Sequence, residues 1–68
     1  MATIYKKVGE NIKKIRNQKG LTQEKLAELA KIDPKSIVQI EAGKRNPTLK
    51  TIKKISRSLK IKPSELLE

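Results

Sequence analysis

The sequence contains no cysteine and no histidine, and Tyr5 is its only aromatic residue. Without cysteine, no disulfide can stabilise the fold and no thiolate can bind a metal ion. Without histidine, the chain also lacks a common zinc ligand and the side chain most often used for acid–base catalysis. A single aromatic ring offers no platform on which unpaired bases can stack, which disfavours single-stranded nucleic acid as a partner. We therefore expect no cofactor and no metal site.

Long apolar runs are also absent, and acidic residues are few. No run approaches the roughly 20 apolar residues of a membrane-spanning helix. The start, "MATIYKKVGENIKK", has no uninterrupted apolar segment after its charges, which argues against a signal peptide. Asp33 is the only aspartate, and no nucleophile has a suitable base nearby. We expect a cytoplasmic protein that is not an enzyme and has no membrane partner.

Positive charge is abundant but unevenly distributed. The 17 Lys and Arg residues exceed the 7 Asp and Glu residues, which gives a net charge of +10. Residues 1–20 carry +5 and residues 48–68 carry +4, whereas residues 21–47 carry only +1. A strongly basic chain favours a polyanionic partner, with nucleic acid first and an acidic membrane surface second. The alternative is that the charge only keeps a small helical domain in solution.

Apolar residues recur at helical spacing almost throughout, and no segment alternates as a strand does. We predict an all-α fold of five helices that forms one compact domain over residues 1–68. The predicted boundaries are a first helix that stops at Gly20, a second capped by Thr22, a third from Asp33 to Gly43, a fourth capped by Thr48, and a final short turn from Pro63. The predicted inward-facing residues are Ile4, Val8, Ile12, Ile15, Leu26, Ala27, Ala30, Ile37, Ile40, Leu49, Ile52, Ile55, Leu59 and Leu66.

The second and third helices are separated by a tight turn, "KID", which is the spacing of a helix-turn-helix. The stretches "GLTQEKLA", "SIVQIEAGKRNP" and "IKPSELL" make the pattern more specific. With them, nearly the whole chain resembles the phage-repressor helix-turn-helix family, which is called Cro/CI-like or Xre-type. The resemblance implies a lambda-repressor-like fold whose third helix enters the major groove of double-stranded DNA.

The third helix is poor in charge, as expected of a helix that distinguishes bases, because charge mainly attracts phosphates that are the same in every sequence. By resemblance, Lys35, Ser36 and Gln39 occupy base-contacting positions, with Gln39 suited to adenine and Lys35 to guanine. Ser36 can contact a base or a phosphate. Pro34 departs from the family, which commonly has a polar residue there: it either gives a base an apolar contact, such as to a thymine methyl, or serves only to start the helix. Val38 either contacts a methyl group or lies exposed.

The resemblance also implies residues that contact the DNA backbone or hold the motif together. The expected phosphate-contacting residues are Thr22, Gln23, Lys44, Arg45, Asn46, Thr48 and Lys13. Arg16 and Glu41 are expected to form a structural ion pair behind the motif. A basic stripe on the fourth helix is typical of membrane-surface or nucleic-acid helices, but its apolar side is needed for the core. We expect that stripe, formed by Lys50, Lys53, Lys54, Arg57 and Lys60, to be a solvated face.

The leading functional interpretation is a sequence-specific DNA-binding transcriptional regulator, a repressor, that acts as a homodimer on a two-fold operator. Ile61 or Leu67 is expected to meet the second copy, while Leu66 completes the core. An antitoxin that binds a toxin and its own promoter is the alternative, and control of a restriction–modification system is one role within the leading class. An engineered version of the fold with no operator is a further possibility. We expect no small-molecule effector.

Overall fold

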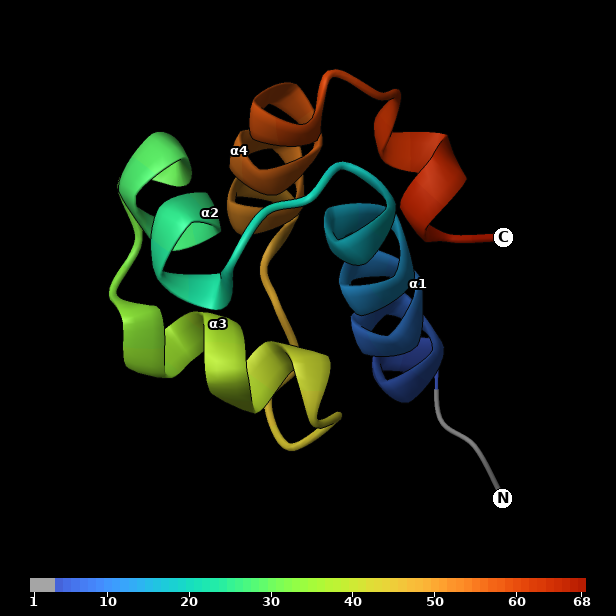
Figure 1. The fold of residues 1–68 in the computed structure, drawn as a ribbon. Helices are drawn as coiled ribbons and strands as arrows, with labels where there is room; N and C mark the ends of the chain where they lie inside the picture. The colour runs from blue at the N-terminus through green and yellow to red at the C-terminus, as the bar shows by residue number, and fades with distance from the viewer. Residues whose placement is uncertain (1–3) are drawn as a thin grey trace.

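Four α-helices and a final 3₁₀ turn form the part of the protein that the structure describes (Figure 1). The structure is a computed structural model that describes residues 4–68. In chain order the elements are α1 (Ile4–Gln18), α2 (Gln23–Ala30), α3 (Pro34–Glu41), α4 (Leu49–Leu59) and η1 (Pro63–Leu66). The predicted all-α class is confirmed.

The predicted count of five helices is wrong in one respect, since the fifth element is a single 3₁₀ turn. The amide of Glu65 bonds to the carbonyl of Lys62 at 3.0 Å, and the amide of Leu67 bonds to the carbonyl of Ser64 at 3.1 Å. These i to i+3 bonds define a 3₁₀ turn, and a segment of four residues is too short for an α-helical ladder.

Each of the last three α-helices begins at a side-chain cap that the sequence predicts. The hydroxyl oxygens of Thr22 and Thr48 accept from amides in the first turns of α2 and α4, at 3.0 and 3.1 Å. The carboxylate of Asp33 accepts from the amide of Lys35 at 2.9 Å, and Pro34 occupies the first turn of α3. These caps satisfy amides that have no partner within the helix, and so they fix where each helix starts.

All four α-helices end in the same hydrogen-bond pattern, with a left-handed residue after the last turn. That residue is Gly20 after α1, Lys31 after α2, Gly43 after α3 and Lys60 after α4, with φ between 55° and 73°. In each case its amide and the next one bond back into the last turn of the helix, as in a Schellman motif. Glycine suits this conformation because it has no Cβ, whereas lysine adopts it less readily.

The helices enclose one hydrophobic core. Its fully or almost fully buried members are Val8, Ile12, Leu26, Ala27, Ile37, Ile40, Ile52, Ile55, Leu59 and Leu66. Ile15 packs against this core but is only partly buried. Two predicted core residues are not buried, because Ile4 is 70% and Leu49 is 63% exposed. Each is the first residue of its helix, where the apolar stripe extends beyond the neighbouring helices.

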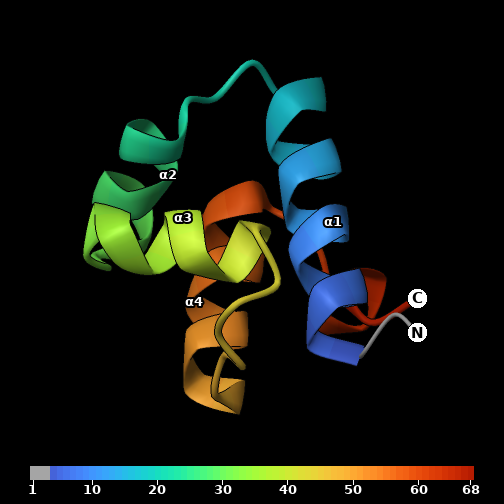
Figure 2. The same ribbon diagram turned by 90° about the horizontal axis from the view of Figure 1, so that it is seen from below.

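Close packing between α1 and α3 sets the position of the helix-turn-helix. Gly9 is buried on the side of α1 that contacts α3, and a Cβ atom built there would overlap the carbonyl oxygen of Ile40. Two helix backbones can approach this closely only where one of them lacks a side chain. Figure 2 looks onto α3 and shows it beside α1 and across α4.

Candidate nucleic-acid interface

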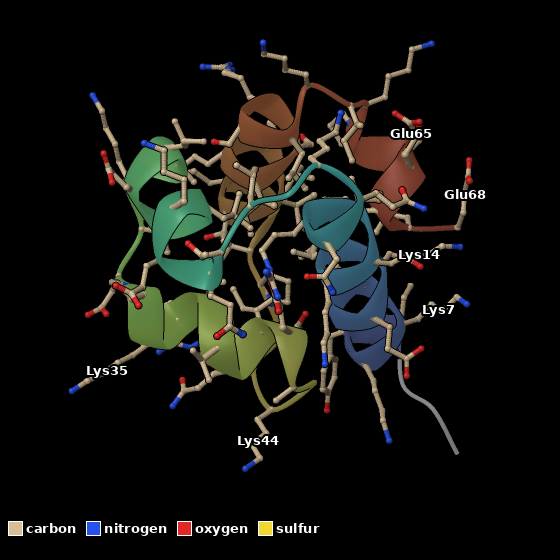
Figure 3. The ribbon with its side chains drawn as sticks, in the orientation of Figure 1. Lys7, Lys14, Lys35, Lys44, Glu65 and Glu68 are labelled. Carbon is tan, nitrogen blue, oxygen red and sulfur yellow. The ribbon has the colours of Figure 1, made fainter. Side chains whose placement is uncertain are left out.

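The outer side of α3 carries the five residues predicted to read bases. Pro34, Lys35, Val38 and Gln39 are exposed, and Ser36 is partly exposed. The opposite side of the helix is held by Ile37 and Ile40, which are 0% and 1% exposed. A helix fixed by its apolar side presents the other side in a defined orientation. The side chain of Lys35 projects away from the molecule beneath α3 (Figure 3).

A buried ion pair connects α1 to the end of α3. The Nε of Arg16 lies 2.7 Å from Oε2 of Glu41, and its Nη2 lies 3.0 Å from Oε1, so the contact is bidentate. The third nitrogen of the guanidinium donates to the carbonyl of Leu21 at 2.6 Å. The two side chains are 9% and 2% exposed, which removes most of the water that weakens surface ion pairs. The predicted pair is therefore present, and its geometry is that of a strong charge-assisted contact.

Gln23 joins this pair from the first residue of α2. Its side-chain amide donates to Oε1 of Glu41 at 3.0 Å. The carboxylate of Glu41, a residue of α3, thus accepts hydrogen bonds from side chains of both α1 and α2. The two helices of the motif, α2 and α3, are thereby tied to α1 at one point. Gln23 is held at the start of α2, where helix amides favour an anion.

Ser36 and Arg45 also contact each other, which the sequence did not predict. The guanidinium of Arg45 donates to the hydroxyl oxygen of Ser36, and this hydrogen bond connects the loop after α3 back to the first half of the helix. A long arginine side chain that is free in solution samples many rotamers. The contact with Ser36 restrains Arg45 beside the outer side of α3.

The remaining candidates for phosphate contact differ in how their side chains are placed. Lys44 and Asn46 are exposed on the loop between α3 and α4, and Lys44 projects to the same side of the molecule as Lys35 in Figure 3. Thr48 is an exposed cap of α4, and its hydroxyl donates to the hydroxyl of Thr51 at 3.0 Å. Thr22 is the exposed cap of α2 described above, and Lys13 is an exposed residue of α1, an element on which no base-reading candidate lies.

The C-terminal turn separates the two residues predicted to meet a second copy. Leu66 is fully buried, as predicted, and Leu67 is 48% exposed. Ile61, in contrast, is partly buried and packs against the core, so it offers less surface than expected. The side-chain amide of Asn11 donates to the carbonyls of Leu66 and Glu68, both at 3.0 Å, and thereby ties the turn to α1.

The basic stripe of α4 is solvent-exposed along its whole length, from Lys50 to Lys60. Its opposite side supplies Ile52, Ile55 and Leu59 to the core, so the apolar side is not available to a membrane surface. Over residues 4–68, none of the helices combines the length and the apolar character required to cross a bilayer.

Three contacts that position the site were not found from the sequence. The glycine in "VGENIKK" weakly indicated a close helix contact, because Gly9 lies inside a helical pattern, where a glycine usually has a packing reason. Asn11 and the Ser36–Arg45 contact gave no signal, since their partners lie far along the chain or across a loop. The spacing of polar residues does not report such contacts.

Comparison with known proteins supports the family suggested by the motifs. A family model described as helix-turn-helix, HTH_3, matches residues 12–66. The control protein C.BamHI of Bacillus amyloliquefaciens is 39% identical over 61 residues, which cover 88% of this chain and 75% of that protein. The immunity repressor of Bacillus phage phi105 is 37% identical over 60 residues, and there the chain spans only 42% of the relative's length.

A solved structure agrees with these relatives. The restriction-modification controller protein C.AhdI from Aeromonas hydrophila matches with a TM-score of 0.89 and 39% identity, covering 91% of this chain and 94% of that one. The family model covers most of the chain, and the helices superpose on a controller protein of the same type. The chain therefore belongs to the phage-repressor-like helix-turn-helix family HTH_3, whose members are DNA-binding transcriptional regulators and not enzymes.

Proposed function

We propose that this protein is a sequence-specific transcriptional regulator that represses by binding a two-fold operator in double-stranded DNA as a homodimer. The observation that carries the proposal is the outer side of α3, which is exposed, low in charge and rigidly backed by the core. A major groove presents hydrogen-bonding groups and methyl groups that such a helix can distinguish. The relatives named as an immunity repressor and as control proteins support the same class of function.

Gln39 is the central base reader in this proposal. It is exposed on the side of α3 opposite Ile37 and Ile40, and a primary amide can donate to and accept from adenine simultaneously. Lys35 provides a second reader suited to guanine. Pro34 and Val38 add apolar surface next to these polar groups, where a thymine methyl can pack.

Phosphate contacts would flank the reading helix on two sides. Gln23 and Thr22 stand at the start of α2, where backbone amides and the helix dipole favour an anion. Lys44, Arg45 and Asn46 occupy the loop after α3. The hydrogen bond from Arg45 to Ser36 supports this role, because a restrained cation loses less conformational freedom when it binds. Thr48 and Lys13 extend the expected contacts at the periphery.

The homodimer would form through the C-terminal turn. Leu67 is an exposed leucine next to the fully buried Leu66, and Asn11 fixes the turn that carries both. A single module with one short reading helix contacts little of the groove, and dimers of such modules reach half-sites about one helical turn apart. Regulation would then depend on protein concentration, since dimer and operator complex form together by mass action.

The decisive experiment is a selection from random duplex DNA, followed by titration of Gln39→Ala against the selected operator and its single-base variants. We expect the variant to lose about 1–3 kcal/mol of specific binding free energy and to relax preference at one base pair per half-site. Gln18→Ala provides a matched control, because Gln18 is an exposed glutamine at the end of α1. If selection yields no shared motif, the proposed function is wrong. If Gln39→Ala keeps every base preference, only the reading role of Gln39 is wrong.

Electrostatics provide a second measurement of the same proposal. With roughly 6–8 phosphates neutralised per dimer, log K should fall against log salt concentration with a slope of about −5 to −7. Gln39→Ala should leave that slope unchanged, because the side chain is neutral. A slope shallower than about −2 would contradict the phosphate contacts assigned above.

A further inference from the structure

A basic surface with an exposed leucine at its centre lies on α2 and α4, away from the reading helix. Leu29 is 47% exposed and lines two shallow hollows of about 330 and 430 Å³. The surface, called here the Leu29 surface, consists of Leu29 together with Lys19, Lys31, Lys54, Arg57 and Lys60. Its five cations are all exposed, and neither hollow has an acidic side chain in the part of its lining that the structure describes.

The charges of this surface are not neutralised within the described part of the chain. Among residues 4–68, ion pairs join Arg16 to Glu41 and Lys25 to Glu28, and no pair within 4.0 Å involves a cation of the Leu29 surface. Glu28, which precedes Leu29 in α2, is the partner of Lys25 at 3.6 Å. Five cations around an apolar side chain are therefore available to an acidic partner.

The ends of α2 and α4 provide an independent argument that charge at this surface serves more than the fold. All four α-helices are followed by a residue in the left-handed conformation, and that residue is glycine after α1 and α3. Lysine replaces glycine after α2 and α4, at Lys31 and Lys60, although a side chain disfavours this conformation. Both lysines stand on the rim of the Leu29 surface. Because Lys31 and Lys60 both adopt a conformation that is unfavourable for lysine at the same surface, we infer that their two positive charges have a function there.

We propose that the Leu29 surface binds an acidic peptide segment of another protein, with an apolar side chain seated beside Leu29 and carboxylates on the surrounding cations. Both hollows are open depressions rather than enclosed pockets, so neither would bury most of the surface of a small ligand. A DNA backbone offers only small sugar C–H groups between its charged phosphates to cover Leu29, and a membrane would need a broader apolar face. Charge complementarity and the single exposed leucine together favour a short acidic segment with one apolar anchor.

The location of the surface leaves the DNA-reading side free. In Figure 1 the C-terminal ends of α2 and α4 point toward the upper edge of the molecule, whereas α3 runs along the lower edge. A bound acidic segment would therefore lie on one side of the domain and DNA on the other. The protein would bridge an operator to a second protein through opposite faces of one small domain.

The test uses fluorescence anisotropy with a short synthetic peptide of Glu and Asp around one central leucine, at an ionic strength of about 0.1 M, where the Debye length is about 10 Å. Lys31→Gly combined with Lys60→Gly should weaken binding about five- to tenfold, because two favourable charge contacts are lost. The melting temperature of this variant should be equal to or above that of the wild type, because glycine suits both positions. Weaker binding then cannot be attributed to unfolding.

A matched control separates a defined site from general attraction to a basic protein. Lys7→Ala combined with Lys14→Ala also lowers the net charge from +10 to +8, and both lysines lie on α1, away from α2 in both ribbon views. This control should bind the peptide within about twofold of the wild type, since exposed charges beyond a Debye length are largely screened. Equal weakening in the two double variants would overturn the proposal.

Two further measurements identify the occupant. Replacing the central leucine of the peptide by serine, or Leu29 by serine in the protein, should weaken binding about tenfold because the apolar contact is lost. If neither change affects peptide binding, the site recognises charge alone and the proposal is overturned. The peptide should also bind the protein in the presence of saturating duplex DNA, and displacement by DNA would contradict it. If the binding of anionic vesicles depends on Lys31 and Lys60 while the binding of the peptide does not, the occupant is lipid and the proposal is overturned.

Discussion

Replacing Arg16 by methionine should destabilise the protein severely, because it leaves the carboxylate of Glu41 buried without its main partner. The substitution removes two hydrogen bonds to that carboxylate and one to the carbonyl of Leu21. Glu41 would retain only the donor from Gln23, in a side chain that is 2% exposed. Breaking a buried pair in this way costs about 3–5 kcal/mol.

That loss is large relative to the total stability of such a chain. At about 0.05–0.15 kcal/mol per residue, a domain of 68 residues has roughly 3–10 kcal/mol of unfolding free energy. For a domain of this size each kcal/mol corresponds to about 4–8 °C of melting temperature. We therefore expect Arg16→Met to melt at least about 12 °C below the wild type or to be unfolded at room temperature.

The assay is thermal and urea unfolding followed by circular dichroism, with two companion variants. Arg16→Met combined with Glu41→Leu should recover most of the loss, to within about 1–2 kcal/mol of the wild type, because no buried charge remains unpaired. Lys25→Met is the matched control, since the pair of Lys25 with Glu28 is exposed and such pairs contribute about 0–1 kcal/mol. A loss below about 1 kcal/mol for Arg16→Met would show that water or another donor compensates Glu41, and would refute the reasoning.

Three further predictions concern the surfaces and the packing. Arg45→Ala should weaken binding to specific and to non-specific duplex DNA by similar factors in a titration, because Arg45 is expected to contact phosphate. A loss of affinity confined to the operator would instead make Arg45 a base reader. Leu67→Glu should shift sedimentation toward monomer with helical circular dichroism largely intact, and loss of the fold would place Leu67 in the core. Gly9→Ala should cost about 1–3 kcal/mol of stability in urea unfolding, since the added Cβ forces α1 and α3 apart; a neutral effect would show that the crossing can relax.

The termini of the helices followed from the sequence, because the chemistry of a helix end is local. Thr22, Asp33 and Thr48 cap the helices that they were predicted to start. Gly20 and Gly43 stand where the first and third helices were predicted to end, and both adopt the left-handed conformation. A cap needs only a short polar side chain within three residues of the amide that it serves. The same local rules could not show that Lys31 and Lys60 end helices in the conformation that glycine favours.

Periodicity predicted most of the core but failed at the first residues of two helices. Spacing correctly indicates the burial of Ile37, Ile40, Ile52 and Ile55. Ile4 and Leu49 fit the apolar stripes of their own helices, α1 and α4, but both are exposed. Spacing determines which side of a helix a residue occupies, but not whether another helix reaches that turn. The extent of each contact depends on how the helices cross.

What the sequence alone determined about this protein is its family, its all-α class and the composition of α3, since these depend on residue types at fixed spacings. The tertiary structure decided which polar residues meet. It joined Arg16, Gln23 and Glu41 from three helices and held Arg45 against Ser36. It also gathered around Leu29 two cations of α4 and the lysines that follow α1, α2 and α4. Such contacts join residues that are far apart in the chain, and only the packing of the helices brings them together.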